Sequence, residues 1–320
     1  MNFKKTLDII GIEVFPDSAL ERLEKEFEIT RFSSANEIKI RNSTHVWLEL
    51  SVMVDEIFLA KFPFLSHIIC RATSTTNLNT FELSSRGIQV ISLRGHSDFL
   101  SKIPSTAELA WFLLQISCIP LVEIQSQINS GMWDRSTLLR SQLVGKNLGI
   151  IGLGRLGKIV AKYAEAFGMN IMYSELKEIS PTPKFTRTTL ANLCKSSDFI
   201  VLTASVYQNN VPILNSEVLK ECNPNLKVIN VSRGFLVDET ILIEKLKNHE
   251  ISYYAADTCK FEELRSTIED HLNFEVMSKM SNVFLTPHIG GYSIEAISET
   301  THHLIDFMSE RSCECIMSKH

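Results

Sequence analysis

The sequence predicts an α/β protein of about two domains, each built around a parallel β-sheet. Its 320 residues exceed one compact core of common size and suit two domains of ~100–200 residues each. Apolar strands alternate with helical segments on both sides of residue 145. Six of the 13 glycines fall between residues 145 and 168, which indicates that the backbone there approaches another object closely.

The first hundred residues are expected to form a small α/β unit. Its strands are predicted at 7–12 together with Val14, 46–52, 65–70 and 88–91. One helix is predicted from Asp17, with Leu20, Leu23 and Phe27 on a single face. Further helices are predicted at 55–62 and 80–86, the second ended by Gly87.

A long apolar helix is predicted over 105–128, with a kink at Pro120. Beyond Gly145 the sequence predicts a second series of strands, at 148–151, 171–173, 199–202, 227–230, 252–256 and 283–285. Helices such as 158–167 separate most of them, and six strands are the number found in a doubly wound nucleotide-binding sheet. A terminal helix is expected over 293–307.

Charge and cysteine usage exclude several classes of partner. Lys and Arg number 32 against 37 Asp and Glu, so the net charge of −5 argues against nucleic acid and anionic membranes as partners. The longest uncharged apolar stretch, 109–122, is shorter than the ~20 residues of a membrane span, and we expect no secretory signal. The seven cysteines are scattered without a Cys-x-x-Cys pair, which favours reduced thiols in the cytoplasm and no metal site.

A glycine motif predicts a dinucleotide cofactor. Gly152, Gly154 and Gly157 form G-x-G-x-x-G between an apolar strand and a helix. The first glycine allows a tight turn, the second lets the backbone approach a pyrophosphate, and the third lets the helix pack on the strand. The helix N-terminus then faces the anion.

Glu175 follows the next predicted strand, 18 residues after Gly157. A carboxylate at that position accepts hydrogen bonds from the adenosine ribose hydroxyls and repels a 2′-phosphate. We therefore expect NAD rather than NADP. Arg155, inside the glycine loop, could also contact a phosphate.

Charged residues follow three consecutive strands and indicate hydride transfer. Arg233 can hold a substrate carboxylate through two parallel hydrogen bonds. His288 can take a hydroxyl proton as hydride leaves, and Glu262 can orient that imidazole and stabilise its charge. Glu263 is an alternative partner for the histidine, and Asp257 is either part of the site or a simple strand-end cap.

The segments 152–157, 231–234, 257–262 and 287–291 together resemble the D-isomer-specific 2-hydroxyacid dehydrogenase family, over roughly 65–305. The resemblance implies a substrate-binding domain of flavodoxin-like fold, residues 1–100 plus 293–320. An NAD-binding Rossmann domain, 101–292, is inserted in it. It also implies a homodimer that uses the helix from Ser105, and a D-2-hydroxy acid or its 2-oxo acid as the substrate.

The family pattern assigns Arg233, Glu262 and His288 to catalysis and Asp257 to the nicotinamide carboxamide. Cofactor contacts are implied for Gly152, Gly154, Arg155, Leu156, Gly157, Glu175, Thr203, Ala204, Val231, Ser232, Asp257, Gly290 and Thr106. Substrate contacts are implied for Thr73, Ser74 and Thr75 together with Arg233.

The chain departs from the family pattern at three points. Residues 72–77 lack the usual glycines of the turn that binds the substrate carboxylate. The segment 202–205 reads Leu-Thr-Ala-Ser in place of Leu-His-x-Pro, and Glu263 replaces a proline. Arg71 and Arg94 each follow a strand; they could hold a second anionic group, but ordinary solvated arginines are expected.

Two other functions are compatible with these patterns. Formate oxidation on the same fold is disfavoured, because formate has no hydroxyl proton for a Glu-supported histidine to remove. A protein of another class, an NAD(H)-sensing corepressor-like protein, would bind the cofactor without turning over a 2-oxo acid.

Overall fold

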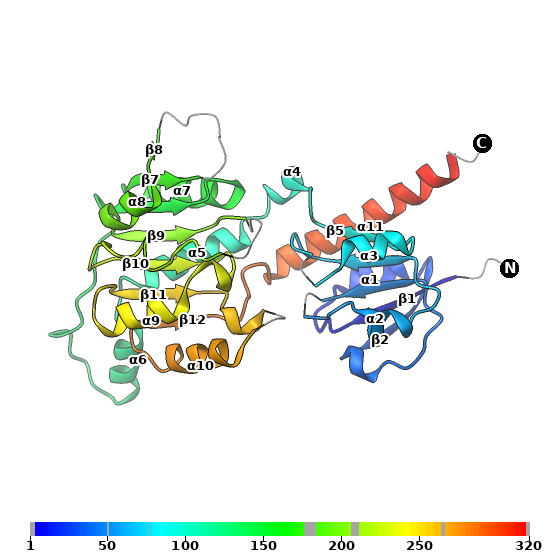
Figure 1. Ribbon diagram of the computed structural model, residues 1–320, viewed down its shortest axis with the longest axis horizontal. Coiled ribbons are helices and arrows are strands. Elements are labelled where there is room, and N and C mark those ends of the chain that lie inside the picture. Colours follow the sequence, from blue (N-terminus) through cyan, green and yellow to red (C-terminus); the bar gives the residue numbers. More distant parts are fainter. Residues whose placement is uncertain are drawn as a thin grey trace. The chain divides into compact units, whose positions relative to one another are not determined.

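The computed structural model describes residues 4–49, 51–75, 77–175, 184–205, 211–263 and 266–317, with side chains as far as Glu310. The chain divides into two compact units (Figure 1). The split unit consists of Met1–Leu100 and Tyr292–His320, and the central unit of Ser101–Gly291. Each unit is built on its own parallel sheet, as the sequence predicted.

The split unit has a five-stranded parallel sheet in the order β2-β1-β3-β4-β5, which is the flavodoxin-like order. Its strands are β1 (Lys5–Ile10), β2 (Phe27–Phe32), β3 (His45–Leu48), β4 (His67–Cys70) and β5 (Gln89–Ser92). Its helices are α1 (Asp17–Leu23), η1 (Ala35–Glu37), α2 (Glu56–Ala60), α3 (Thr80–Ser85), α4 (Ser97–Leu100) and α11 (Ile294–Met317).

The central unit has a seven-stranded parallel sheet in the order β12-β11-β10-β9-β6-β7-β8. Its strands are β6 (Asn147–Ile151), β7 (Asn170–Ser174), β8 (Thr186–Arg187), β9 (Phe199–Leu202), β10 (Lys227–Asn230), β11 (Tyr253–Ala256) and β12 (Val283–Leu285). Its helices are α5 (Ser105–Ile116), α6 (Leu121–Asn129), α7 (Arg155–Ala166), α8 (Leu190–Ser196), η2 (Gly234–Leu236), α9 (Glu239–Lys247), η3 (Lys260–Glu262) and α10 (Ile268–Met277). The strand order reverses between β6 and β9, and ligands of such sheets bind at the carboxyl ends of the strands beside this reversal.

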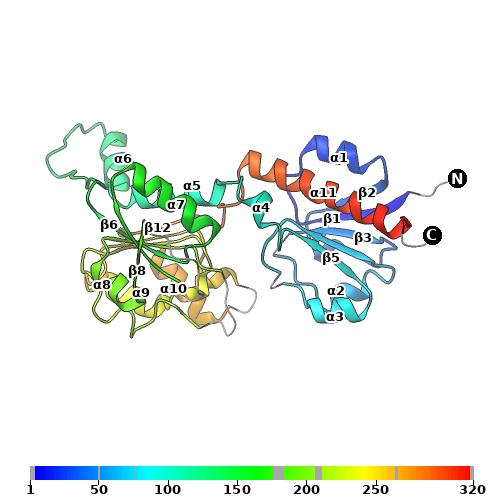
Figure 2. The same ribbon diagram turned by 90° about the horizontal axis from the view of Figure 1, so that it is seen from above.

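Helices cover both faces of the central sheet (Figure 2). α5 and α7 lie on one face, where their buried side chains form a core with residues such as Ile150. α8, α9 and α10 lie on the other face, where the core includes Ile151. Because successive side chains of a strand point to opposite faces, two neighbouring isoleucines of β6 serve two different cores.

Several predicted elements differ from those in the structure. Phe27 belongs to β2 rather than to the first helix, which ends at Leu23. The predicted helix 105–128 is two helices, α5 and α6, bent by 70° at the break before Pro120. The first strand stops at Ile10, and the central sheet has the short extra strand β8.

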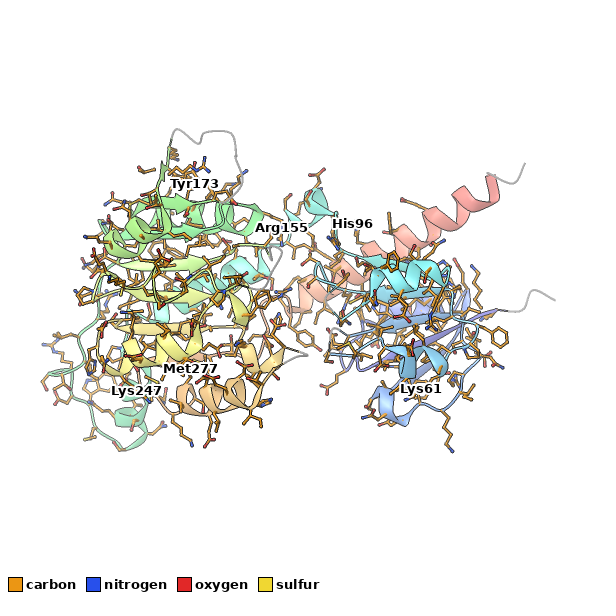
Figure 3. The ribbon with its side chains drawn as sticks, in the orientation of Figure 1. Lys61, His96, Arg155, Tyr173, Lys247 and Met277 are labelled. Carbon is orange, nitrogen blue, oxygen red and sulfur yellow. The ribbon has the colours of Figure 1, made fainter. Side chains whose placement is uncertain are left out.

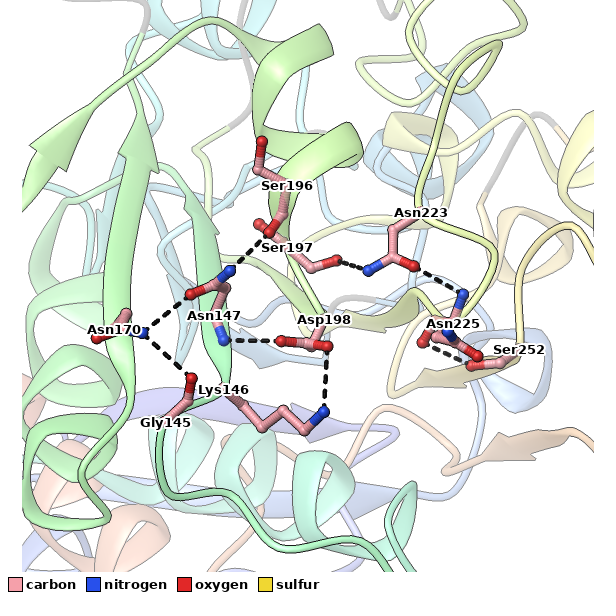
Figure 4. A network of polar contacts seen from close by, with 10 residues as sticks. All are labelled: Gly145, Lys146, Asn147, Asn170, Ser196, Ser197, Asp198, Asn223, Asn225 and Ser252. Atoms are coloured by element: carbon pink, nitrogen blue, oxygen red, sulfur yellow. Dashed lines mark hydrogen bonds and ion pairs between the residues drawn. The ribbon is translucent and has the colours of Figure 1, made fainter.

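The amino ends of the central strands are joined by a polar network (Figure 4). The Asn147 backbone N–H donates to Asp198 Oδ2 over 2.9 Å, and its side chain donates to the Ser196 carbonyl over 3.0 Å. The Asn170 side chain donates to Asn147 Oδ1 over 3.1 Å. These contacts hold the starts of β6, β7 and β9 together, so the amino edge serves as a framework.

Within the described ranges, no single helix is long and apolar enough to cross a membrane; only the bent pair α5 and α6, taken together, has the necessary length and composition.

Candidate active site

The glycine loop after β6 is shaped by close packing at two of its three glycines. Gly152 has φ +93°, and a Cβ there would lie 2.6 Å from the Ala204 Cα. A Cβ on Gly157 would lie 2.3 Å from the Gly152 carbonyl oxygen. No other residue type fits these two positions, because such distances are far below van der Waals contact.

Gly154 is different, since a Cβ there would meet nothing within 4 Å. It is the N-cap of α7, so the open space lies at the positive end of a twelve-residue helix. Leu156 packs against the core, and Arg155, labelled in Figure 3, is partly buried, which lowers its pKa. This turn fits a pyrophosphate, so the residues present fit a dinucleotide cofactor.

Glu175 directly follows β7, as predicted. The Arg187 guanidinium donates to the Glu175 carbonyl oxygen over 3.0 Å. An arginine from β8 therefore lies next to the residue expected to select the adenosine ribose. The sequence offered no signal for this neighbour, because β8 has only two residues.

The loops after β9 and β10 pack against the glycine loop. Thr203 Oγ1 donates to the Gly152 carbonyl over 2.7 Å, and Ser232 Oγ donates to the Ala204 carbonyl. Val231 is buried beside them. Four predicted cofactor residues thus come together with the glycine turn at one edge of the sheet.

Arg233 is fixed by a residue to which the sequence analysis assigned no role. Asn230, the last residue of β10, accepts the Ser232 N–H and donates to the Arg233 carbonyl, each over 3.0 Å. The half-buried Arg233 guanidinium donates to the Ser232 carbonyl over 2.7 Å. A Cβ on Gly234 would lie 2.2 Å from the Cys259 carbonyl carbon, so a glycine is required for this segment to pack against η3.

Asp257 organises the loop that carries His288. Its buried carboxylate accepts hydrogen bonds from Thr286 Oγ1 at 2.6 Å and from the Ile289 and Gly290 N–H groups at 2.8 Å each. Burial raises the Asp257 pKa, while these hydrogen bonds oppose that rise. This residue is therefore more than a strand-end cap; its contact with nicotinamide stays a prediction.

His288 and Glu262 form a direct pair. His288 Nδ1 lies 3.0 Å from Glu262 Oε2, and the two side chains are 38% and 26% exposed. The hydrogen bond to Glu262 raises the His288 pKa, against the opposing effects of burial and of Arg233. Of the two adjacent glutamates, Glu262 makes this contact, while burial raises the pKa of Glu263.

The start of α5 reaches the same loop. Ser105 Oγ donates to the Gly290 carbonyl over 2.7 Å, and a Cβ on Gly290 would lie 3.0 Å from the Thr106 Cγ2. Thr106 and Gly290, both predicted to contact the cofactor, are therefore neighbours.

The predicted substrate residues of the split unit follow β4. Thr73 is exposed and Ser74 and Thr75 are partly buried, while Thr76 lies outside the described residues. Their contact with substrate stays a prediction. Arg71 is not a solvated arginine: its side chain is 8% exposed, lies 3.8 Å from Glu49 and donates to Thr301. Arg94 is exposed, as expected.

Comparison with known proteins decides the family. The model of the D-isomer specific 2-hydroxyacid dehydrogenase NAD-binding domain matches residues 113–290. A glyoxylate reductase of Thermococcus gammatolerans is 31% identical over 298 residues, covering 88% of this chain and 85% of the relative. The chain belongs to the D-isomer specific 2-hydroxyacid dehydrogenase family.

A hydroxypyruvate reductase of Thermotoga maritima is 33% identical over 72% of each chain. The D-lactate dehydrogenase of Aquifex aeolicus, solved with NAD and lactic acid, has the same fold, with a TM-score of 0.80 at 20% identity over 97% of this chain and 96% of that one.

Membership gives the site its chemical frame. The protein is a 2-hydroxyacid dehydrogenase, an oxidoreductase whose central unit binds NAD. The sequence-based resemblance, the fold class and the cofactor are thereby confirmed.

Proposed function

We propose that this 2-hydroxyacid dehydrogenase reduces a small 2-oxo acid of the glyoxylate or hydroxypyruvate type with NADH, and oxidises the corresponding D-2-hydroxy acid in reverse. The observation that carries the proposal is the 3.0 Å contact between His288 and Glu262 in a unit that also presents Arg233. Two relatives are named glyoxylate reductase and hydroxypyruvate reductase, and these names support a substrate with few carbon atoms for this protein.

His288 is the proton donor and acceptor in this proposal. Glu262 accepts a hydrogen bond from His288 Nδ1, so His288 Nε2 remains to face the substrate oxygen. For reduction the imidazole begins protonated, and the neighbouring carboxylate favours that form. For oxidation it begins neutral and accepts the hydroxyl proton.

Arg233 binds the substrate carboxylate and carbonyl in this proposal. Its backbone is fixed by Asn230 on one side and by the tight packing of Gly234 on the other, so the Arg233 side chain projects from a rigid backbone. Thr73, Ser74 and Thr75 supply further substrate contacts.

The cofactor is held along the carboxyl edge of the central sheet. The Gly154 turn and the N-terminus of α7 bind the pyrophosphate. The Glu175 carboxylate accepts hydrogen bonds from the adenosine ribose hydroxyls, so NAD is preferred over NADP. The bound nicotinamide supplies or accepts the hydride. Asp257 shapes the loop around His288 and faces the carboxamide.

The test is a panel of 2-oxo acids followed by NADH absorbance, with glyoxylate, hydroxypyruvate, pyruvate and a phosphorylated analogue. We expect turnover that is highest with the first two compounds and is lost in His288→Gln. Tight NADH binding without turnover of any member would instead favour the NAD(H)-sensing protein. NAD-dependent oxidation of formate would favour the formate dehydrogenase.

We also propose a homodimer formed through α6 and the segment that follows it. This part of the chain exposes large apolar side chains: Met132 is 55% exposed, Trp133 93%, Leu139 84% and Val144 66%. Clustered exposed apolar residues mark interaction surfaces, and a second copy of this chain would cover them.

A cytoplasmic location is the remaining proposal. It is supported by the described cysteines Cys70, Cys118, Cys194, Cys222 and Cys259, which are all free thiols.

A further inference from the structure

A buried carboxyl group lies directly behind the proposed catalytic residues. Glu239 is the first residue of α9 and is 2% exposed. Its Oε1 accepts the Lys260 N–H over 2.8 Å. Lys260 begins η3, and Glu262 ends it. The position of the Glu262 backbone therefore depends on a hydrogen bond that η3 donates to a group outside the site.

The second oxygen of Glu239 has unmet hydrogen-bonding capacity. Glu239 Oε2 is buried and, among the residues that the structure describes, has no hydrogen-bond partner. An ionised carboxylate in such surroundings is costly, whereas a neutral carboxylic acid is tolerated. Burial accordingly raises the Glu239 pKa to about 7, and the charges of Asp270 and Glu262 add to the rise.

Tyr254 connects this group to the other half of the site. Burial raises the pKa of the hydroxyl of this β11 residue, the Glu239 charge adds to the rise, and the Asn230 side chain opposes it. Asn230 is the residue that fixes Arg233 through its amide. Glu239 and Tyr254 thus underlie both the segment that bears Arg233 and the turn that bears Glu262.

We propose that Glu239 is a positioning residue for the reaction: as a neutral acid it holds η3, and with it Glu262, in the active arrangement, and its ionisation disturbs that arrangement. The inference rests on the roles proposed for Arg233, Glu262 and His288. Glu239 lies behind the backbone of η3, where it acts through the Lys260 N–H.

The groups around Glu239 determine the sign of the pH effect. Asp270 of α10, Glu262 of η3, Cys259 and Tyr254 all face it, and the Asp270 carboxylate is paired with Lys260 Nζ at 2.9 Å. A new negative charge on Glu239 repels the Glu262 carboxylate and so opposes the folded position of the turn. Ionisation of Glu239 should therefore loosen the turn that bears Glu262 and lower the reduction activity as the pH rises through about 7.

The experiment compares three variants of the full-length protein. Glu239→Gln keeps the acceptor for Lys260 N–H but cannot ionise, Glu239→Ala removes the acceptor, and Glu244→Gln makes the same change at an exposed position of α9. Rates of 2-oxo acid reduction and NADH affinities are measured between about pH 5.5 and 9.

We expect Glu239→Gln to match the parent at about pH 6 and to keep its reduction activity to a higher pH than the parent. Glu239→Ala should lower kcat about ten-fold at all pH values, with NADH affinity unchanged, because it leaves a buried N–H unpaired. Glu244→Gln should leave both readouts unchanged. Parent-like kcat and a parent-like pH profile in the first two variants would overturn the proposal.

A stability measurement separates this inference from the proposed function. The folded pKa of Glu239 lies above its ordinary value of 4.5, so its stabilising contribution is complete below that value and is lost as the pH rises through about 7. The parent melting temperature should therefore fall more between about pH 5 and 8 than that of Glu239→Gln. If no 2-oxo acid is turned over but this difference in melting temperature appears, the proposed function fails, whereas the titration of buried Glu239 is supported. If the difference is missing, Glu239 does not titrate as proposed.

Discussion

Replacing Glu262 by Gln tests the proposed acid/base pair most directly. The change removes one charge, keeps the shape of the side chain and leaves an oxygen 3.0 Å from His288 Nδ1. The hydrogen bond to Glu262 is the largest influence on the raised His288 pKa, while burial and Arg233 act in the opposite direction. The variant imidazole should therefore lose its proton at lower pH than the parent imidazole.

The size of the effect follows from the exposure of the pair. A hydrogen bond to a charged group contributes about 1.5–3 kcal/mol when buried. His288 is 38% exposed, so solvent screening reduces the effect to about 1 kcal/mol. This corresponds to roughly five-fold less imidazolium at a fixed pH above the pKa, and thus to a roughly five-fold slower reduction there.

The assay is a pair of pH–rate profiles, for 2-oxo acid reduction and for hydroxy acid oxidation. Both limbs should move to lower pH in Glu262→Gln, so that oxidation keeps its rate to lower pH than in the parent. Glu263→Gln is the matched comparison, because it removes the adjacent charge without removing a hydrogen bond to His288. Unmoved limbs in Glu262→Gln, or an equal movement in Glu263→Gln, would refute the assignment.

The same pair makes a prediction about stability. The folded His288 pKa is raised, so its contribution is present below the unfolded value of ~6.5 and is lost as the pH rises through the folded value. Glu262→Gln should therefore destabilise the protein more at about pH 5.5 than at about pH 9, as read from urea unfolding. Equal destabilisation at both pH values would indicate a purely structural contact.

Three further changes probe the cofactor, the substrate and the loop, and one probes the dimer. Glu175→Ala should raise kcat/KM with NADPH relative to NADH, since it removes the carboxylate that repels a 2′-phosphate; equal use of both cofactors by the parent would contradict this. Arg233→Lys should lower kcat/KM for the 2-oxo acid by about 10²-fold with near-normal NADH affinity, because the two-pronged contact is lost; a loss of NADH binding in a folded variant would place Arg233 at the cofactor instead. Asp257→Asn should lower both kcat and the melting temperature, because an amide cannot accept three hydrogen bonds in the same way, at a cost of about 1–3 kcal/mol; a parent-like melting curve would count against this. Trp133→Glu should shift the dimer toward monomer in light scattering, and an unchanged mass would move the interface elsewhere.

The fold was largely predictable because its strands are short, apolar and separated by glycines and polar turns. The wrong predictions came from local residue patterns that are compatible with more than one type of secondary structure. Phe27 continues the helical spacing from Leu20 and Leu23, yet the alternation from Phe27 to Phe32 is that of a strand, and pairing with β1 decided the outcome. The break before Pro120 was predicted only as a kink, since sequence shows that a helix is interrupted but not the direction in which the chain continues.

The candidate site was predictable where position along a strand determines location. Arg233 and Asp257 follow adjacent parallel strands, so their neighbourhood follows from the order of the elements. Asn230 and Glu239 went unassigned for the same reason. An asparagine at a strand end and an acid in the first turn of a helix are both common, and only burial and partners distinguish these two from ordinary ones.

The backbone of His288 shows how the loop holds the proposed acid/base residue in place. Its φ of +53° is left-handed, a conformation that costs a residue other than glycine about 1–3 kcal/mol. The three hydrogen bonds from Thr286, Ile289 and Gly290 to the Asp257 carboxylate, with the His288 N–H bound to the Asp257 carbonyl, offset that cost. The imidazole is thus directed by its backbone and by the Glu262 carboxylate. This arrangement leaves 38% of the side chain exposed, so His288 can exchange its proton with solvent after each turnover without any change in the loop that positions it.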